Sequence, residues 1–171
     1  IRCEQMFNVC LLVELAKDGS GSTGGREKIV PIRQGDDWGF PCCATKMKPY
    51  DAQTFQDPTG EMAGRLLQDS DCAGVAAENV SLKIGDTPFG IDFEGGSWEA
   101  PWQNRAFVAM HGAVGTLIGS RVVALGLDMM TGLPLPSSNI EGLLEAAPNM
   151  MDFVTGWDDR TLSHGRATAL A

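Results

Sequence analysis

RAFVAMHGA, residues 105–113, and RVVALGL, residues 121–127, are two apolar runs separated by a glycine-containing stretch. Small apolar residues without interruption are typical of a strand that lies inside a sheet and is covered on both faces. His111 follows the first run directly, and the loops at strand ends usually carry the chemistry of a β scaffold. The two runs therefore predict a β core. They make His111 the first candidate site residue, with a purely structural histidine as the alternative.

Shorter runs at residues 28–32, 80–84, 89–93 and 151–157 predict further strands. Pro31 predicts an edge strand or a bulge, because proline has no N–H to donate to a ladder. The 21 glycines and 9 prolines leave little room for long helices. Short strands between such turns predict an all-β sandwich, barrel or propeller, and no sharp internal repeat selects among the three.

The first 26 residues remain unassigned to this fold. Residues 6–15 are apolar enough for a buried strand or a short helix, and residues 18–25, DGSGSTGG, are typical of a flexible linker. The globular part is therefore expected to span residues 27–171. Because the chain starts at Ile1 and its last residues resemble the beginning of a strand, we expect a fragment of a longer protein.

The charge of the chain argues against two classes of partner. The formal net charge is −9, the isoelectric point is about 4.6, and basic residues form no cluster. Nucleic acids and anionic membrane surfaces are bound through clustered lysine and arginine, so neither partner is expected. The sequence also has no apolar run of transmembrane length.

The five cysteines indicate an oxidising compartment. An odd number leaves at least one of them without an internal partner. A bond from Cys42 or Cys43 to Cys72 would close a loop of about 30 residues and contribute about 3 kcal/mol. An N-glycosylation sequon begins at Asn79. Together these features favour an extracellular, secreted protein.

Few residues carry recognisable chemistry. No metal site is predicted, because the two histidines are isolated and neither a CxxC pair nor an HExxH motif occurs. Asp86 and Thr87 lie between two predicted strands, either in a proline-fixed turn or in a turn that faces a ligand. The rigid guanidinium of Arg166 suits a carboxylate or an oxidised ring system, and a plain surface arginine is the alternative.

Six segments resemble, in their order and spacing, one known family. They are WGFP (38–41), GDTPFGIDF (85–93), NRAFVAMHGAVG (104–115), SRVVALGLD (120–128), DFVTGW (152–157) and HGRATA (164–169). This order resembles the C-terminal half of the glucose/sorbosone dehydrogenase β-propellers, particularly the fungal pyrroloquinoline quinone (PQQ)-dependent pyranose dehydrogenases. The resemblance covers roughly residues 27–171.

The resemblance implies a six-bladed propeller, of which this chain would hold about the last three blades. It implies a secreted oxidoreductase that oxidises the C1 hydroxyl of a sugar by hydride transfer to PQQ. His111, Arg166, Asp86 and Thr87 match positions that approach the cofactor. The calcium ligands and the histidine general base are expected outside this fragment, which would then be inactive alone. A cytochrome domain or another electron acceptor is the expected redox partner.

A second class of function is also compatible with the sequence. The same segments could form a non-catalytic, secreted β-propeller piece that binds carbohydrate or another protein. Only the enzyme should reduce a dye when sugar, PQQ and calcium are supplied together, so this activity separates the two hypotheses.

Overall fold

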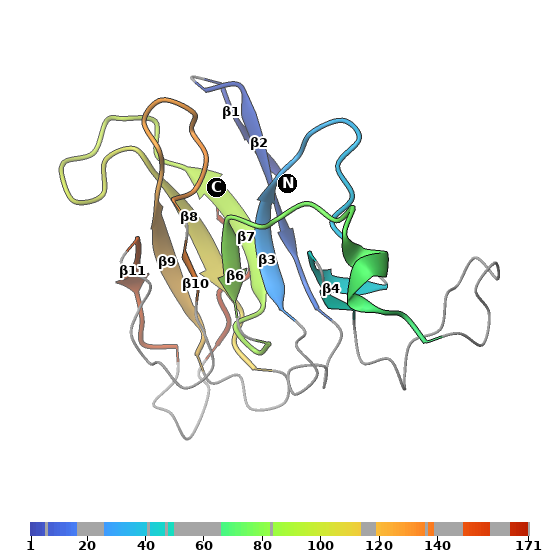
Figure 1. Ribbon diagram of the computed structural model, residues 1–171. Coiled ribbons are helices and arrows are strands. Elements are labelled where there is room, and N and C mark those ends of the chain that lie inside the picture. Colours follow the sequence, from blue (N-terminus) through green and yellow to red (C-terminus); the bar gives the residue numbers. More distant parts are fainter. Residues whose placement is uncertain are drawn as a thin grey trace.

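The computed structural model of this chain describes residues 1–5, 7–16, 26–40, 42–46, 48–49, 66–82, 84–113, 119–135, 137–138, 149–157 and 165–170. These residues form an all-β structure in which two sheets lie face to face (Figure 1). Within the described residues the helical structure is limited to one 3-10 turn, η2 (Asp69–Cys72). The predicted all-β class is confirmed.

The first sheet has five strands in the order β1-β2-β3-β6-β10. Their bounds are Arg2–Glu4, Val9–Glu14, Glu27–Pro31, Val80–Leu82 and Ser137–Ser138. Neighbours pair antiparallel, except that β10 runs parallel to β6. Strands β1 and β2 come from the first 26 residues, which the sequence analysis left unassigned. Of the two alternatives for residues 6–15, the structure shows a strand, β2, and not a helix.

Pro31 does not mark an edge strand, since β3 pairs with β2 on one side and with β6 on the other. The N–H of Ile32 donates to the carbonyl of Cys10 (2.8 Å). Because donors alternate in direction along a strand, the nitrogen of Pro31 points away from β2. On that side β6 pairs only as far as Ile29, so no ladder bond is lost.

The second sheet has four antiparallel strands in the order β11-β9-β8-β7. Their bounds are Met150–Val154, Arg121–Gly126, Arg105–Met110 and Pro88–Phe93. These are the strands that the apolar runs predict. Strand β8 lies between β7 and β9 and is buried on both faces, which explains its uninterrupted apolar sequence.

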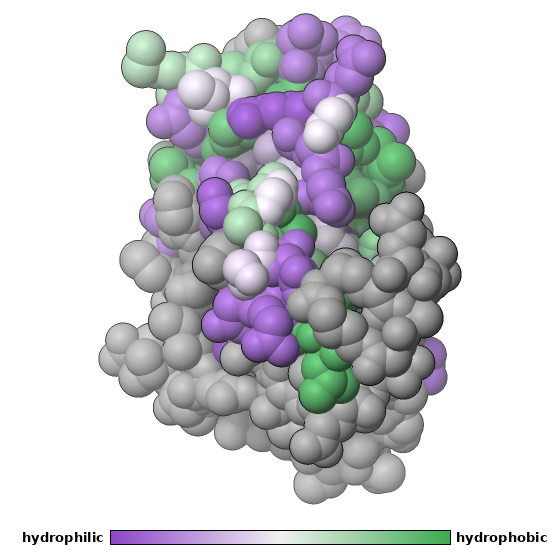
Figure 2. All heavy atoms as spheres, turned by 45° about the vertical axis from the view of Figure 1, so that its right-hand side comes forward, coloured by the Kyte–Doolittle hydropathy of each residue, from purple (hydrophilic) through white to green (hydrophobic). Residues whose placement is uncertain are grey.

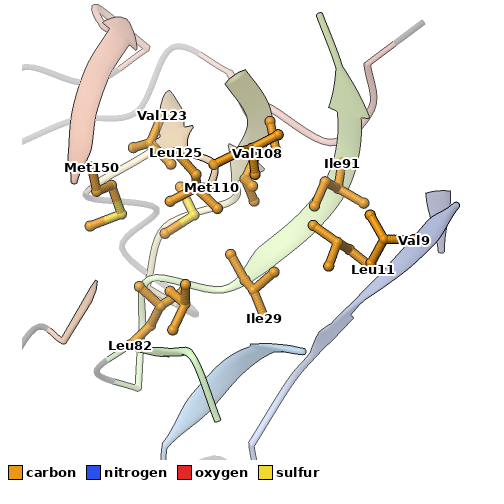
Figure 3. Packing of buried hydrophobic residues seen from close by; sticks show 13 residues of the cluster. Val9, Leu11, Ile29, Leu82, Ile91, Val108, Met110, Val123, Leu125 and Met150 are labelled. Atoms are coloured by element: carbon orange, nitrogen blue, oxygen red, sulfur yellow. The ribbon is translucent and has the colours of Figure 1, made fainter. Parts of the chain in front are cut away.

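The main core lies between the two sheets. Side chains alternate along each strand, so Val108 and Met110 point inward toward Leu11 and Ile29 of the first sheet (Figure 3). The opposite face of the second sheet carries a smaller cluster built on Phe107, Ala109, Val122, Ala124 and Ala167. On the face shown in Figure 2, hydrophilic and hydrophobic residues intermingle over the described surface.

A small hairpin of β4 (Cys43–Thr45) and β5 (Lys48–Pro49) lies beside η2. The disulfide Cys43–Cys72 joins the hairpin to η2 and confirms one of the two predicted pairings. A second disulfide, Cys3–Cys10, links β1 to β2 and was not predicted. Cys42 belongs to neither disulfide and packs against the first one.

The described residues form no closed ring of sheets, so a propeller is not shown and stays a prediction. Nor does any helix in the described part of the chain have the length and apolar character needed to span a membrane.

Candidate functional site

The candidate site lies at the end of the second sheet, where β7 begins and β8 ends. The N–H of His111 donates to the carbonyl of Thr87 (2.8 Å), and the N–H of Gly112 donates to that of Asp86 (3.3 Å). These bonds extend the β7–β8 ladder beyond the pair Pro88 and Met110. They therefore bring two of the predicted site segments side by side.

The turn before β7 has a strained backbone that other residues hold in place. Thr87 has a φ of 49°, in the left-handed region that β-branched residues rarely adopt. The buried carboxylate of Glu27, from β3, accepts hydrogen bonds from the N–H groups of Thr87 and Gly85. Such strain persists where the surroundings over-determine it, commonly at functional sites.

Arg166 reaches the same place from the C-terminal segment. Its Nη1 lies 2.9 Å from Nε2 of His111. Because a guanidinium only donates hydrogen bonds, Nε2 must be the acceptor, and the imidazole is neutral with its proton on Nδ1. The ring of Phe89 stacks on the imidazole, with centroids 5.3 Å apart and planes inclined by 27°.

The surroundings of His111 favour this neutral form. Burial lowers the pKa of His111, and the positive charge of Arg166 lowers it further. The backbone of Gly112 raises the pKa in the opposite direction without cancelling the shift. The imidazole is thus uncharged at neutral pH, and the cationic group of the pair is Arg166.

A second arginine at this end of the sheet is neutralised by carboxylates. Arg121, the first residue of β9, places Nη2 3.5 Å from Asp86 and Nε 3.1 Å from Asp152. Asp86 is buried, with 2% of its surface exposed. By contrast, no carboxylate of the described residues lies within ion-pair distance of Arg166. The guanidinium of Arg166 is instead in contact with the imidazole of His111.

All four predicted cofactor-facing residues thus lie together, although they come from three separate segments. The carboxylate of Asp86 points to Arg121 rather than to His111. Sequence reasoning missed Arg121, Glu27 and Phe89. Arg121 had a usable signal, because β9 begins at the end of the sheet where the antiparallel β8 stops.

The glycosylation sequon lies outside this cluster. Its first residue, Asn79, directly precedes β6, and its side-chain amide donates to the carbonyl of Pro134 (3.2 Å). Among the described residues, no group of three or more His, Cys, Asp or Glu side chains could hold a metal ion.

Comparison with known proteins identifies no relative of this chain. No protein-family model matches the chain, and neither the curated proteins nor the solved structures include a significant match. The chain is therefore defined by its own features as a two-sheet, disulfide-bonded β structure with a polar cluster at one sheet end.

Proposed function

We propose that this chain is the cofactor-facing part of a secreted, PQQ-dependent sugar dehydrogenase, in which Arg166 and His111 hold the quinone cofactor. The observation that carries the proposal is the 2.9 Å contact between these two side chains, which lie 55 positions apart in sequence. The resemblance to the pyranose dehydrogenases assigns both residues to the cofactor, and their proximity supports that assignment.

The chemistry of the cluster fits a tricarboxylate quinone. Arg166 supplies a forked donor for a carboxylate or for the adjacent quinone oxygens. The neutral His111 accepts one of the arginine's N–H groups and so orients the fork. When bound, the quinone would supply the hydride acceptor for sugar oxidation. The described residues offer no comparable set of oxygen ligands for calcium, so no role for calcium is derived from this chain.

The arrangement of strands supports the propeller part of the proposal. Each sheet contains four neighbouring antiparallel strands in chain order, β1-β2-β3-β6 and β7-β8-β9-β11. Four-stranded antiparallel sheets packed face to face are the units of β-propellers. The extended segment 165–170 packs on the outer face of the second sheet, where the first strand of a third blade would lie. The two disulfides support secretion.

The decisive experiment is a titration of the chain with PQQ, followed by calorimetry or by the absorbance of the quinone. We expect Arg166→Gln to weaken binding at least tenfold. Arg105→Gln removes the same charge at the opposite end of β8 and serves as the matched control, with less than a twofold effect. Absence of PQQ binding to the folded chain, or equal affinities of the two variants, would overturn the proposal.

The same titration distinguishes the competing class of function. Binding of a saccharide by a chain that never binds PQQ would favour a non-catalytic binding module. Sugar-dependent dye reduction that requires PQQ, measured on a longer protein containing this segment, would establish the enzyme.

A further inference from the structure

Strand β7 contains one more residue than the part of β8 that pairs with it. Gly90 of β7 pairs with Ala109 of β8. The next residue of β8, Met110, pairs with Pro88 rather than with Phe89. Phe89 is therefore the extra residue of a β-bulge. Bulges point a side chain in a new direction, and they are common next to functional sites.

The bulge turns the ring of Phe89 out of the core. Ile91 points into the core between the two sheets (Figure 3), so alternation along an unbroken strand would point Phe89 inward as well. Phe89 is instead 51% exposed, and Pro88 takes the buried position. The ring of Phe89 stacks on the imidazole of His111.

The same shift in register pairs the turn before β7 with His111. Beyond the bulge, the carbonyl of Thr87 accepts the N–H of His111 (2.8 Å). If Phe89 took the regular place opposite Met110, Pro88 would lie opposite His111 in place of Thr87. One inserted residue therefore sets both the backbone pairing of His111 and the aromatic ring that covers it.

Among the described residues, two contacts hold the side chain of His111. Nε2 accepts a hydrogen bond from the guanidinium of Arg166 (2.9 Å), and the ring of Phe89 covers one face. Nδ1 is buried and makes no hydrogen bond of ordinary geometry in the described part of the chain, so this atom does not fix the ring. Rotation of the imidazole would separate Nε2 from Arg166, and the stacked ring of Phe89 opposes that rotation.

We propose that Phe89 is a positioning residue of the candidate site: its bulge places the aromatic ring against His111, which keeps Nε2 directed at Arg166 and the proton on Nδ1. Which nitrogen of a histidine carries the proton is set by the partner of the other one, so orientation and tautomer are linked. The use of this arrangement in cofactor binding rests on the proposed function. The positioning itself is a property of the chain without cofactor.

The tautomer of His111 is the readout of the test. Long-range ¹H–¹⁵N correlation spectra, recorded above the ordinary pKa of histidine, show which imidazole nitrogen carries the proton. His164→Gln assigns the signals of the two histidines. We expect the Nδ1–H form in the unchanged chain and in Phe89→Tyr, which keeps the ring. Phe89→Leu should shift His111 toward the Nε2–H form that a free imidazole prefers.

Phe40→Leu is the matched control. It removes a similarly exposed ring from a different turn and should leave the tautomer of His111 unchanged. Deletion of Phe89 tests the bulge itself. The pairs Pro88–Met110 and Gly90–Ala109 would then follow each other in a regular ladder, so we expect this variant to fold and to lose the preference for Nδ1–H.

Thermal unfolding of each variant separates a changed tautomer from a lost structure. If neither Phe89→Leu nor the deletion folds, nuclear Overhauser contacts between the rings of Phe89 and His111 in the unchanged chain provide the measurement. The proposal is overturned if folded Phe89→Leu keeps the Nδ1–H form, if Phe89→Tyr loses it, if the unchanged chain carries the proton on Nε2, or if the ring contacts are absent. A chain that shows these shifts but binds no PQQ would overturn the proposed function and support the positioning role.

Discussion

Gly90 in β7 lies against the backbone of Thr168 so closely that a Cβ at Gly90 would be 2.9 Å from the carbonyl oxygen of Thr168. The same Cβ would be 3.0 Å from Cα of Ala169. Both obstacles are backbone atoms, which cannot rotate aside. The absence of a side chain at position 90 is therefore what allows the segment 165–170 to lie on the sheet.

Gly90→Ala is expected to displace this segment and to disturb the Arg166–His111 contact. We expect faster amide exchange over residues 165–170 and weaker PQQ binding, with the two-sheet core retained. Gly74→Ala is the matched control, because nothing lies within 4 Å of its added Cβ. Equal exchange rates in the two variants would contradict the close packing of this segment.

The stability of the fold is expected to depend on the protonation of His111. Its pKa in the folded chain is lowered from the ordinary value of 6.5 by burial and by Arg166, so the unfolded chain binds the proton more readily. The corresponding stability is present above about pH 6.5 and is lost as the pH falls through the lower folded-state pKa. His111→Gln should abolish this dependence in urea denaturation between pH 7.5 and 5. His164→Gln, which keeps His111, should preserve it.

Glu94 organises the loop between β7 and β8, because its carboxylate accepts N–H groups of Ser97, Trp98 and Asn104. Burial raises the pKa of Glu94, but these backbone donors outweigh it and the net shift is downward from 4.5. The resulting stability is present above pH 4.5 and is lost as the pH falls through the folded-state pKa.

Glu94→Gln should therefore cost about 1.5–3 kcal/mol at pH 7, the usual contribution of hydrogen bonds to a charged group. The difference from the unchanged chain should shrink on acidification to pH 3. The exposed Glu99 belongs to the same loop, and Glu99→Gln should change the free energy of unfolding by less than about 0.5 kcal/mol. A cost at pH 7 that persists in full at pH 3 would argue against a role for the charge.

The two disulfides should differ in their contribution to stability. Cys43 and Cys72 are 29 positions apart, and Cys3 and Cys10 are 7 apart. Loop-closure entropy predicts about 3.5 kcal/mol for the longer loop and about 2.5 kcal/mol for the shorter one. Paired Cys→Ala variants, compared by denaturant unfolding, check the order. Cys42→Ser leaves both disulfides intact and should lower the free energy of unfolding less than either paired variant. A larger loss on removing Cys3–Cys10 than on removing Cys43–Cys72 would indicate that loop-closure entropy does not decide their contributions.

The strands of the second sheet could be predicted because their apolar runs are local and uninterrupted. Strand β2 could not, since an apolar segment of that length fits a helix equally well and only its pairing with β3 decides. His111 and Arg166 were predicted as site residues. Arg121 was not, although its position at the start of β9, opposite the end of the antiparallel β8, is a signal that the sequence offers. The contact between the rings of Trp98 and Phe153 was also missed, because these residues come from a loop and a distant strand that no sequence pattern connects.

Glu27 connects the two sheets, so the geometry of the site depends on the register of β3. It comes from the first sheet, yet its carboxylate holds the strained turn at Thr87 from which the site of the second sheet begins. Side chains alternate along a strand, so a slip of β3 by one residue would turn Glu27 away and present Lys28 in its place. A cation there could accept nothing from the N–H groups of the turn. The proposed binding of PQQ at His111 and Arg166 would then be lost in a fold with this shifted register of β3, so PQQ binding would report the correct register during refolding.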